Sequence, residues 1–163
     1  MRMLAASAAL ILLSSAAPAF AAPAHVSVTV GPELQAKAEK TYGVREVTRL
    51  TDSLREDVQR ALARSGAYED ARVELVLVDA KPNRPTFKQM TDTPGLSMES
   101  FGVGGAAIEG RIVAADGSVT PVAYRWYESD IRQAYGNWIW HDAQWTFNRF
   151  ASRLAKRDQL ARR

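Results

Sequence analysis

The spacing of hydrophobic residues changes along the chain and predicts a series of separate elements. Residues 25–30 alternate between polar and apolar side chains, a pattern typical of a strand. From residue 46 the apolar positions follow helical spacing, which predicts an amphipathic helix ending in a left-handed cap at Gly66. Between these two elements, residues 33–40 fit either a short polar helix or an irregular crossing. The apolar stripe of the predicted helix comprises Val47, Leu50, Leu54, Val58, Ala61 and Leu62.

Three further strands are predicted in the middle of the chain. Residues 72–79 are apolar on both faces after Glu74, as expected of an interior strand. Residues 100–114 and 119–128 are separated by a short Ala-Asp-Gly segment, which fits a three-residue hairpin loop with Gly117 in the left-handed position. The resulting register pairs Ala114 with Ser118, Ile108 with Tyr124, Ala106 with Trp126, Glu109 with Ala123, and Ala107 with Arg125. One face of this hairpin is then apolar and the other is charged, with Glu109 and Arg125 as a predicted diagonal ion pair.

The connection before this hairpin shows no clear periodicity. Residues 81–97 contain three prolines and are expected to form an irregular loop. The segment GVGGAA at residues 102–107 invites comparison with a phosphate-binding loop, but its spacing differs from G-x-G-x-x-G and no helix follows it. We therefore expect its glycines to permit a bulge or the close approach of a helix backbone.

The last predicted element is an amphipathic helix over residues 140–157. Asp142 lies in its first turn, opposite the apolar stripe, where a negative charge interacts favourably with the helix dipole. Together these elements predict a two-layer α+β fold in which about four strands form an antiparallel sheet, or a mixed one if the first strand pairs in parallel. The helices at residues 46–65 and 140–157 would cover one face. The stripe of the terminal helix comprises Trp140, Ala143, Phe147, Phe150, Ala151 and Leu154.

One large side chain of this helix does not fit the stripe. Trp145 lies about 140° around the helix from Trp140, on the flank that carries His141 and Arg149. An exposed tryptophan needs a partner, which could be a loop of the same chain, another chain or a ligand. We expect Trp138 and the loop at residues 81–97 to cover it. The candidate binding surface is therefore Trp138, His141, Trp145 and Arg149.

The titratable residues form no recognisable catalytic motif. Side chains of His141 and Asp142 diverge on a helix and cannot pair with each other. Positions three and four residues beyond His141 hold Gln144 and Trp145, which do not suit a metal site. We expect no catalytic residues, no metal and no cofactor.

Two other pairs of polar residues have ordinary structural interpretations. Glu128 and Asp130 fit a solvated strand end, although two carboxylates on one strand face could also serve acid–base chemistry. Asp79 and Asn83 lie beside the proline-containing loop and fit turn chemistry.

The composition narrows the class of protein. A chain of 163 residues suits one domain, and a net charge of +3 does not favour nucleic-acid binding. The absence of cysteine excludes disulfides, thiol catalysis and lipidation at an N-terminal cysteine.

The N-terminal segment predicts export. Arg2, the apolar residues 4–13 and the small-x-small motif at residues 19–21 form a signal peptide with cleavage between Ala21 and Ala22. We therefore expect residues 1–21 to be removed, leaving a single periplasmic α+β domain over residues 22–163 with a short basic C-terminal tail. No stable membrane insertion is expected after cleavage.

The second half resembles a group of Gram-negative envelope proteins of unknown function, many of them lipoproteins. The resemblance covers the last 60 or so residues and rests on GGAAIE at residues 104–109, the ADG turn, and the W-x-D-A-x-x-x-F-x-x-F-A-x-x-L pattern from Trp140 to Leu154. It implies a small envelope α+β domain and supplies no catalytic residue; the chain lacks the lipobox cysteine of the lipidated members.

These observations predict a non-catalytic periplasmic binding or envelope-assembly domain, whose partner would be an envelope protein or a glycan. The alternative is a small envelope hydrolase, or a carbohydrate-binding protein that stacks sugars on Trp138 and Trp145. The sequence indicates no oligomeric state.

Overall fold

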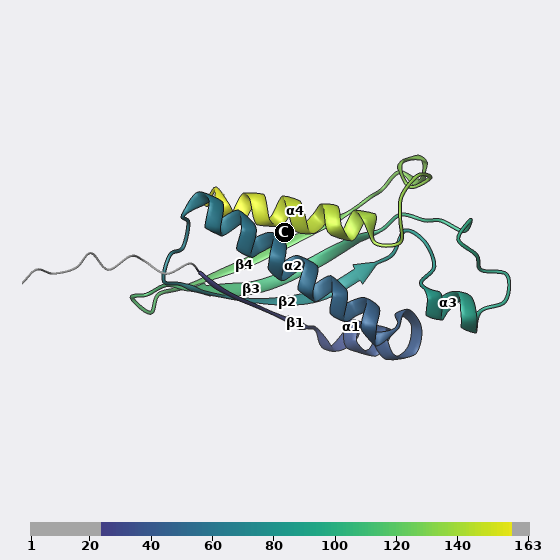
Figure 1. Cartoon of the computed structure of the whole chain (residues 1–163), viewed down its shortest axis with the longest axis horizontal. Helices are drawn as coiled ribbons and strands as arrows, with labels where there is room; N and C mark the ends of the chain where they lie inside the picture. Colours follow the sequence, from purple (N-terminus) through teal and green to yellow (C-terminus); the bar gives the residue numbers. More distant parts are fainter. Residues whose placement is uncertain (1–23, 158–163) are drawn as a thin grey trace, which may run out of the picture.

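A computed structural model describes residues 24–157 and shows a four-stranded sheet covered on one face by two long helices (Figure 1). The predicted signal peptide and the basic tail lie outside the described residues. In chain order the elements are β1 (His25–Val30), α1 (Pro32–Lys37), a π-helical turn (Ala38–Tyr42), α2 (Val44–Ser65), β2 (Arg72–Lys81), α3 (Phe87–Asp92), β3 (Gly105–Val113), β4 (Val119–Tyr127), a 3-10 turn (Ile131–Gln133) and α4 (His141–Ala155).

The sheet follows the order β1-β2-β3-β4 and is mixed. β1 pairs with β2 in parallel because α2 carries the chain back across the sheet between them, whereas the other neighbours are antiparallel. The predicted α+β architecture is confirmed, and β2 is an interior strand as expected.

The predicted register of the β3–β4 hairpin is confirmed at each pair. The amide of Ala114 donates to the carbonyl oxygen of Ser118 at 2.9 Å, and Gly117 has a φ of 83°. The predicted ion pair between Glu109 and Arg125 is wrong. Glu74 of β2 lies directly opposite Arg111 of β3 and binds it at 2.7 Å, and among residues 24–157 no ion pair joins Glu109 to Arg125.

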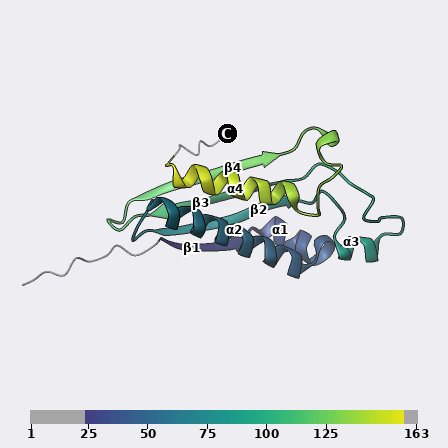
Figure 2. The same ribbon diagram turned by 45° about the horizontal axis from the view of Figure 1, so that its top comes forward.

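The core lies between the sheet and the two helices. Figure 2 shows α2 and α4 side by side along the same face of the sheet. The predicted stripes of both helices are buried; Leu54, Phe147 and Phe150 have no exposed surface. Trp140 is also buried, and its indole N–H donates to Glu46 at 3.0 Å.

Two segments are more regular than the sequence pattern indicated. Residues 33–40 lie in the short helix α1 and the π-helical turn that follows it. Within the loop at residues 81–97, α3 begins with a capping box. The Thr86 hydroxyl accepts from the backbone N–H of Gln89, and the side-chain oxygen of Gln89 accepts from the backbone N–H of Thr86. A threonine three residues before a glutamine is the sequence signal that would have predicted α3.

β3 begins at Gly105, later than the predicted residue 100. The reason is that Gly102 donates its amide to the carbonyl oxygen of Asn83 at 2.7 Å, in the loop that precedes α3, rather than to a neighbouring strand. None of the helices in the described part of the chain is long and apolar enough to cross a membrane.

Candidate functional site

The candidate site lies where β1, β2 and β4 end and α4 begins. Two loops, residues 82–104 and 128–140, meet at this end of the domain (Figure 1). Arg84 joins them, because its guanidinium group donates to the carbonyl oxygens of Asn137 at 2.7 Å and Tyr135 at 2.6 Å in one loop, and to that of Met98 in the other. The backbone of both loops is thereby held by one side chain.

A buried polar network anchors the same loops to α4. The carboxylate of Asp142 accepts hydrogen bonds from the Asn83 amide group at 2.6 Å, from the Gly104 backbone at 2.9 Å and from the Asn137 amide group at 3.1 Å. In return, the side-chain oxygen of Asn83 accepts from the backbone N–H of Asp142 at 3.0 Å. These bonds satisfy Asp142, which is 3% exposed, and Asn83, which is 1% exposed.

Asp142, predicted to lie opposite the apolar stripe, is nevertheless buried, and Asn83 is more than a turn residue. Loop 82–104 folds over the first turn of α4 and buries the carboxylate, which a helical wheel does not show. The nearest sequence signal is the position of Asp142 between the core residues Trp140 and Ala143.

The glycine-rich segment serves this close packing. A Cβ atom on Gly104 would lie 2.7 Å from the carbonyl oxygen of Lys81 and 2.8 Å from the Asn83 side chain. A Cβ atom on Gly105 would overlap the backbone of β4. The expected close approach is present, but it is made by a loop and a neighbouring strand rather than by a helix.

Four aromatic side chains are exposed on these two loops. Phe87 is 65%, Phe101 41%, Tyr135 73% and Trp138 67% exposed. Phe101 and Tyr135 touch edge to face, with ring centres 5.7 Å apart, and the Arg84 guanidinium lies 6.0 Å from the Phe101 ring. We call these four residues the aromatic end.

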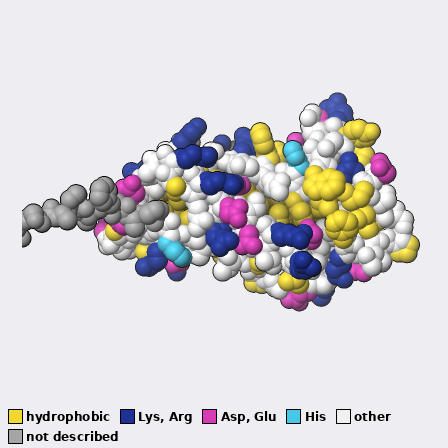
Figure 3. All heavy atoms as spheres, viewed as in Figure 1, with side chains coloured by type: hydrophobic (Ala, Val, Ile, Leu, Met, Phe, Trp, Pro, Cys, Tyr) yellow, Lys and Arg dark blue, Asp and Glu magenta, His cyan; other side chains and the backbone are white. Residues whose placement is uncertain are grey.

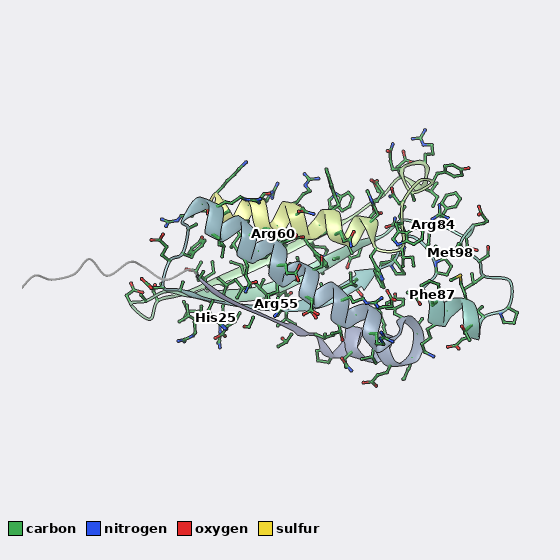
Figure 4. The ribbon with its side chains drawn as sticks, in the orientation of Figure 1. His25, Arg55, Arg60, Arg84, Phe87 and Met98 are labelled. Atoms are coloured by element: carbon green, nitrogen blue, oxygen red, sulfur yellow. The ribbon has the colours of Figure 1, made fainter. Side chains whose placement is uncertain are left out.

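The figures show how the aromatic end is placed. Figure 4 places Arg84, Phe87 and Met98 together at this end, with His25 at the opposite end of the domain. In Figure 3 hydrophobic side chains gather in a broad patch at the same end. Because monomeric proteins rarely expose large contiguous apolar patches without a function, this surface is a candidate interface.

A pocket adjoins the aromatic end on the α4 side, with a volume of about 290 Å³. β4 contributes Trp126, the 128–140 loop contributes Glu128 and two amide side chains, and the first turns of α4 contribute the remainder. We call it the Trp145 pocket; its lining includes Trp126, Glu128, Gln133, Asn137, His141 and Trp145.

Three of the four predicted surface residues lie together along α4. His141 and Trp145 line the pocket, and the Arg149 guanidinium lies 5.9 Å from the Trp145 ring centre. Trp138 is not among the lining residues and belongs to the aromatic end. The expectation that the chain covers Trp145 is wrong, because this side chain is 50% exposed and no residue of the loop at residues 81–97 is among those that line its pocket.

Of the other titratable candidates, Glu128 lines this pocket, whereas Asp79 and Asp130 do not. Asp79 binds Lys37 at 2.7 Å and accepts from the Tyr127 hydroxyl at 2.7 Å. Burial would raise the pKa of Asp79, but the hydrogen bonds from Lys37 and Tyr127 outweigh it and hold this pKa below its ordinary value. Burial, followed by the hydrogen bond to Asp79, raises the pKa of the Tyr127 phenol.

Asp130 has a separate partner. Arg132 binds it at 2.7 Å and, by donating hydrogen bonds, holds the pKa of the Asp130 carboxyl below its ordinary value. Asp79, Asp130 and His141 thus have different surroundings and form no shared acid–base site. Across residues 24–157, no three His, Cys, Asp or Glu side chains converge as a metal site would require.

Comparison with protein families and with curated protein sequences finds no match to the chain. Among solved structures, the chain is similar to the "putative lipoprotein from Caulobacter crescentus CB15", with 16% sequence identity, coverage of 85% of each chain and a TM-score of 0.33. A similarity at this level carries no argument about function. The geometry itself defines a two-layer α+β domain with an aromatic end and an adjoining pocket.

Proposed function

We propose that this protein is a non-catalytic binding domain of the bacterial cell envelope, and that it binds an envelope protein through the aromatic end. The observation that supports this proposal most directly is the exposure of Phe87, Phe101, Tyr135 and Trp138 on two loops at one end of the domain. Aromatic residues are enriched in the buried centres of protein interfaces, where they act as anchors.

The aromatic end is also held in place before any partner binds. Arg84 ties the two loops together through three backbone carbonyls, and the Asn83–Asp142 network ties them to α4. Ordering a loop on binding reduces affinity, so a surface that is already ordered retains more of the contact energy. This favours a recognition surface over an incidental group of exposed rings.

A binding role is favoured over catalysis by the separation of the titratable groups. An enzyme needs an acid, a base or a nucleophile meeting in one cleft. Asp79 and Asp130 are each engaged by a basic side chain outside the Trp145 pocket. His141 and Glu128 both line that pocket, but among the described residues no hydrogen bond joins them into an acid–base pair.

The envelope location is proposed from the N-terminal sequence and from the resemblance of the last 60 or so residues to Gram-negative envelope proteins. We expect a periplasmic extract to yield a chain that begins at Ala22, because the small-x-small motif ends at Ala21. Intact-mass spectrometry of the extracted protein measures this directly. Recovery of the chain with Met1 still attached, in the cytosol, would contradict export.

The aromatic end is tested with a double variant, Phe101→Ala with Trp138→Ala. We expect capture of envelope proteins by the tagged mature chain, quantified by mass spectrometry, to fall at least about tenfold, since truncating interface anchors costs about 2 kcal/mol or more each. Thermal unfolding should change little because both side chains are substantially exposed.

The matched control is Val119→Ala, which also removes an exposed apolar side chain but lies on β4 at the hairpin loop, at the other end of the strand. It should leave the captured proteins unchanged. If the double variant captures the same proteins in the same amounts as the wild type, the aromatic end is not the interface.

A further inference from the structure

We propose that the Trp145 pocket binds one neutral pyranose unit, a hexose or an N-acetylhexosamine, of an envelope glycan. This inference rests on the proposed non-catalytic binding role and names a second ligand at a site beside the aromatic end. Three features support it: the exposed ring of Trp145, the polar side chains that line the pocket, and the negative charge of that lining.

The Trp145 ring is exposed yet restrained. Arg149, four residues later on α4, holds its guanidinium 5.9 Å from the ring centre. His141, four residues earlier, lines the pocket together with Trp145. Because residues four apart are neighbours on a helix surface, the indole lies between Arg149 on one flank and the pocket on the other. A restrained aromatic face suits stacking against the apolar face of a sugar ring.

The size of the pocket limits the ligand. Its volume of about 290 Å³ lies just below the range of typical small-molecule sites, about 300–1,000 Å³. A single sugar ring fits this space, and the open side allows a glycan chain to continue outward. Trp126 also lines the pocket, from β4, and adds apolar surface.

The polar lining can both donate and accept hydrogen bonds, as sugar hydroxyls require. Glu128 uses one carboxylate oxygen to accept from the amides of Ser129 at 2.7 Å and Asp130 at 2.9 Å, which orients the side chain and leaves its second oxygen available. Within the described residues, the side chains of Gln133 and His141 form no hydrogen bond to the protein. An amide, an imidazole and a carboxylate oxygen are thus available together.

The charge of the lining selects against anions. Glu128 and Asp142 both contribute to the pocket, and no lysine or arginine in the described part of the chain lines it. A phosphate or uronate would meet carboxylates without a compensating cation. An organic cation is the main rival, because tryptophan and a carboxylate can also bind a quaternary ammonium group; Arg149 already occupies one flank of the Trp145 ring.

The test is a titration followed by nuclear magnetic resonance of the tryptophan indole N–H groups of the mature chain. The probes are maltotriose, cellotriose and the trimer of N-acetylglucosamine, with choline chloride as the cationic rival and trigalacturonate as the anionic one. We expect at least one neutral trisaccharide to shift the Trp145 signal saturably, with a dissociation constant of about 1 mM, because the site is shallow. The Trp138 signal should stay unchanged.

Variants distinguish the loss of ring stacking at Trp145 from a general effect of substitutions in α4. Both variants lack the Trp145 indole, so their affinity is read from the indole signal of Trp126, which also lines the pocket. Trp145→Ala should raise the dissociation constant at least tenfold, whereas Trp145→Phe, which keeps an aromatic face, should raise it about threefold. Asn148→Ala changes an exposed residue of the same helix outside the pocket and should leave it within twofold.

Several outcomes overturn the sugar site. These are the absence of a saturable shift with all three neutral sugars, saturation by choline or trigalacturonate instead, and unchanged sugar affinity in Trp145→Ala. None of these outcomes bears on the capture of envelope proteins through Phe101 and Trp138, because these two residues do not line the pocket. Conversely, cleavage of a trisaccharide during the titration would contradict the non-catalytic role while leaving the sugar site in place.

Discussion

Replacing Asp142 with alanine should lower the free energy of unfolding by about 3–5 kcal/mol, one of the two largest losses expected from a single substitution at this site. The carboxylate is buried and accepts three hydrogen bonds, from Asn83, Gly104 and Asn137. Alanine leaves the buried donors of Asn83 and Gly104 without an acceptor, and each unsatisfied buried donor costs about 1–3 kcal/mol. Denaturant unfolding monitored by circular dichroism measures the change.

Two controls identify the cause of this loss. Asp142→Asn keeps an accepting oxygen and should lose about 1–2 kcal/mol. Asp52→Ala removes a carboxylate that is exposed on α2 and binds Arg55 at 2.8 Å, so it should change stability by less than about 0.5 kcal/mol. Equal midpoints for Asp142→Ala and the wild type would show that the network does not hold loop 82–104 against α4.

Gly105→Ala is expected to have a comparable effect, a loss of about 3–4 kcal/mol, for steric rather than polar reasons. The added Cβ atom would lie 2.6 Å from the Cα atom of Tyr127 and overlap the carbonyl oxygen of Trp126. The backbone at Gly105 also has a φ of 148°, a conformation that residues with a side chain rarely adopt. Relief of this overlap would require β3 and β4 to separate beside the Trp145 pocket, since Trp126 lines it.

Gly117→Ala separates the cost of the steric overlap from the cost of the positive φ. Gly117 has a φ of 83°, and no atom of residues 24–157 lies within 4 Å of the Cβ position, so alanine there meets the conformational penalty alone. We expect a loss of about 1 kcal/mol. If Gly105→Ala is no more destabilising than Gly117→Ala in the same urea titration, the close approach of β3 to β4 is not a constraint.

The elements with clear periodicity could be predicted from the sequence alone. The stripe through Leu50, Leu54 and Val58 predicts α2 because a helix with one apolar face must bury that face, whatever it packs against. The hairpin register also follows locally, since the loop ending in Gly117 determines which residues face each other along β3 and β4. Export is predicted from the N-terminal residues, and stays a prediction.

The candidate site depended on tertiary structure, because its contacts join residues that are far apart in the chain. Asn83 and Asp142 are 59 positions apart, and no periodicity near either one indicates that a loop would bury the carboxylate. The exposure of Trp145 depended in the same way on where loop 82–104 packs: held by Arg84 and Asn83, it covers the first turn of α4 and leaves the next turn open. Local patterns determine which face of an element is apolar, whereas the burial of a polar side chain is determined by the distant segment that packs over it.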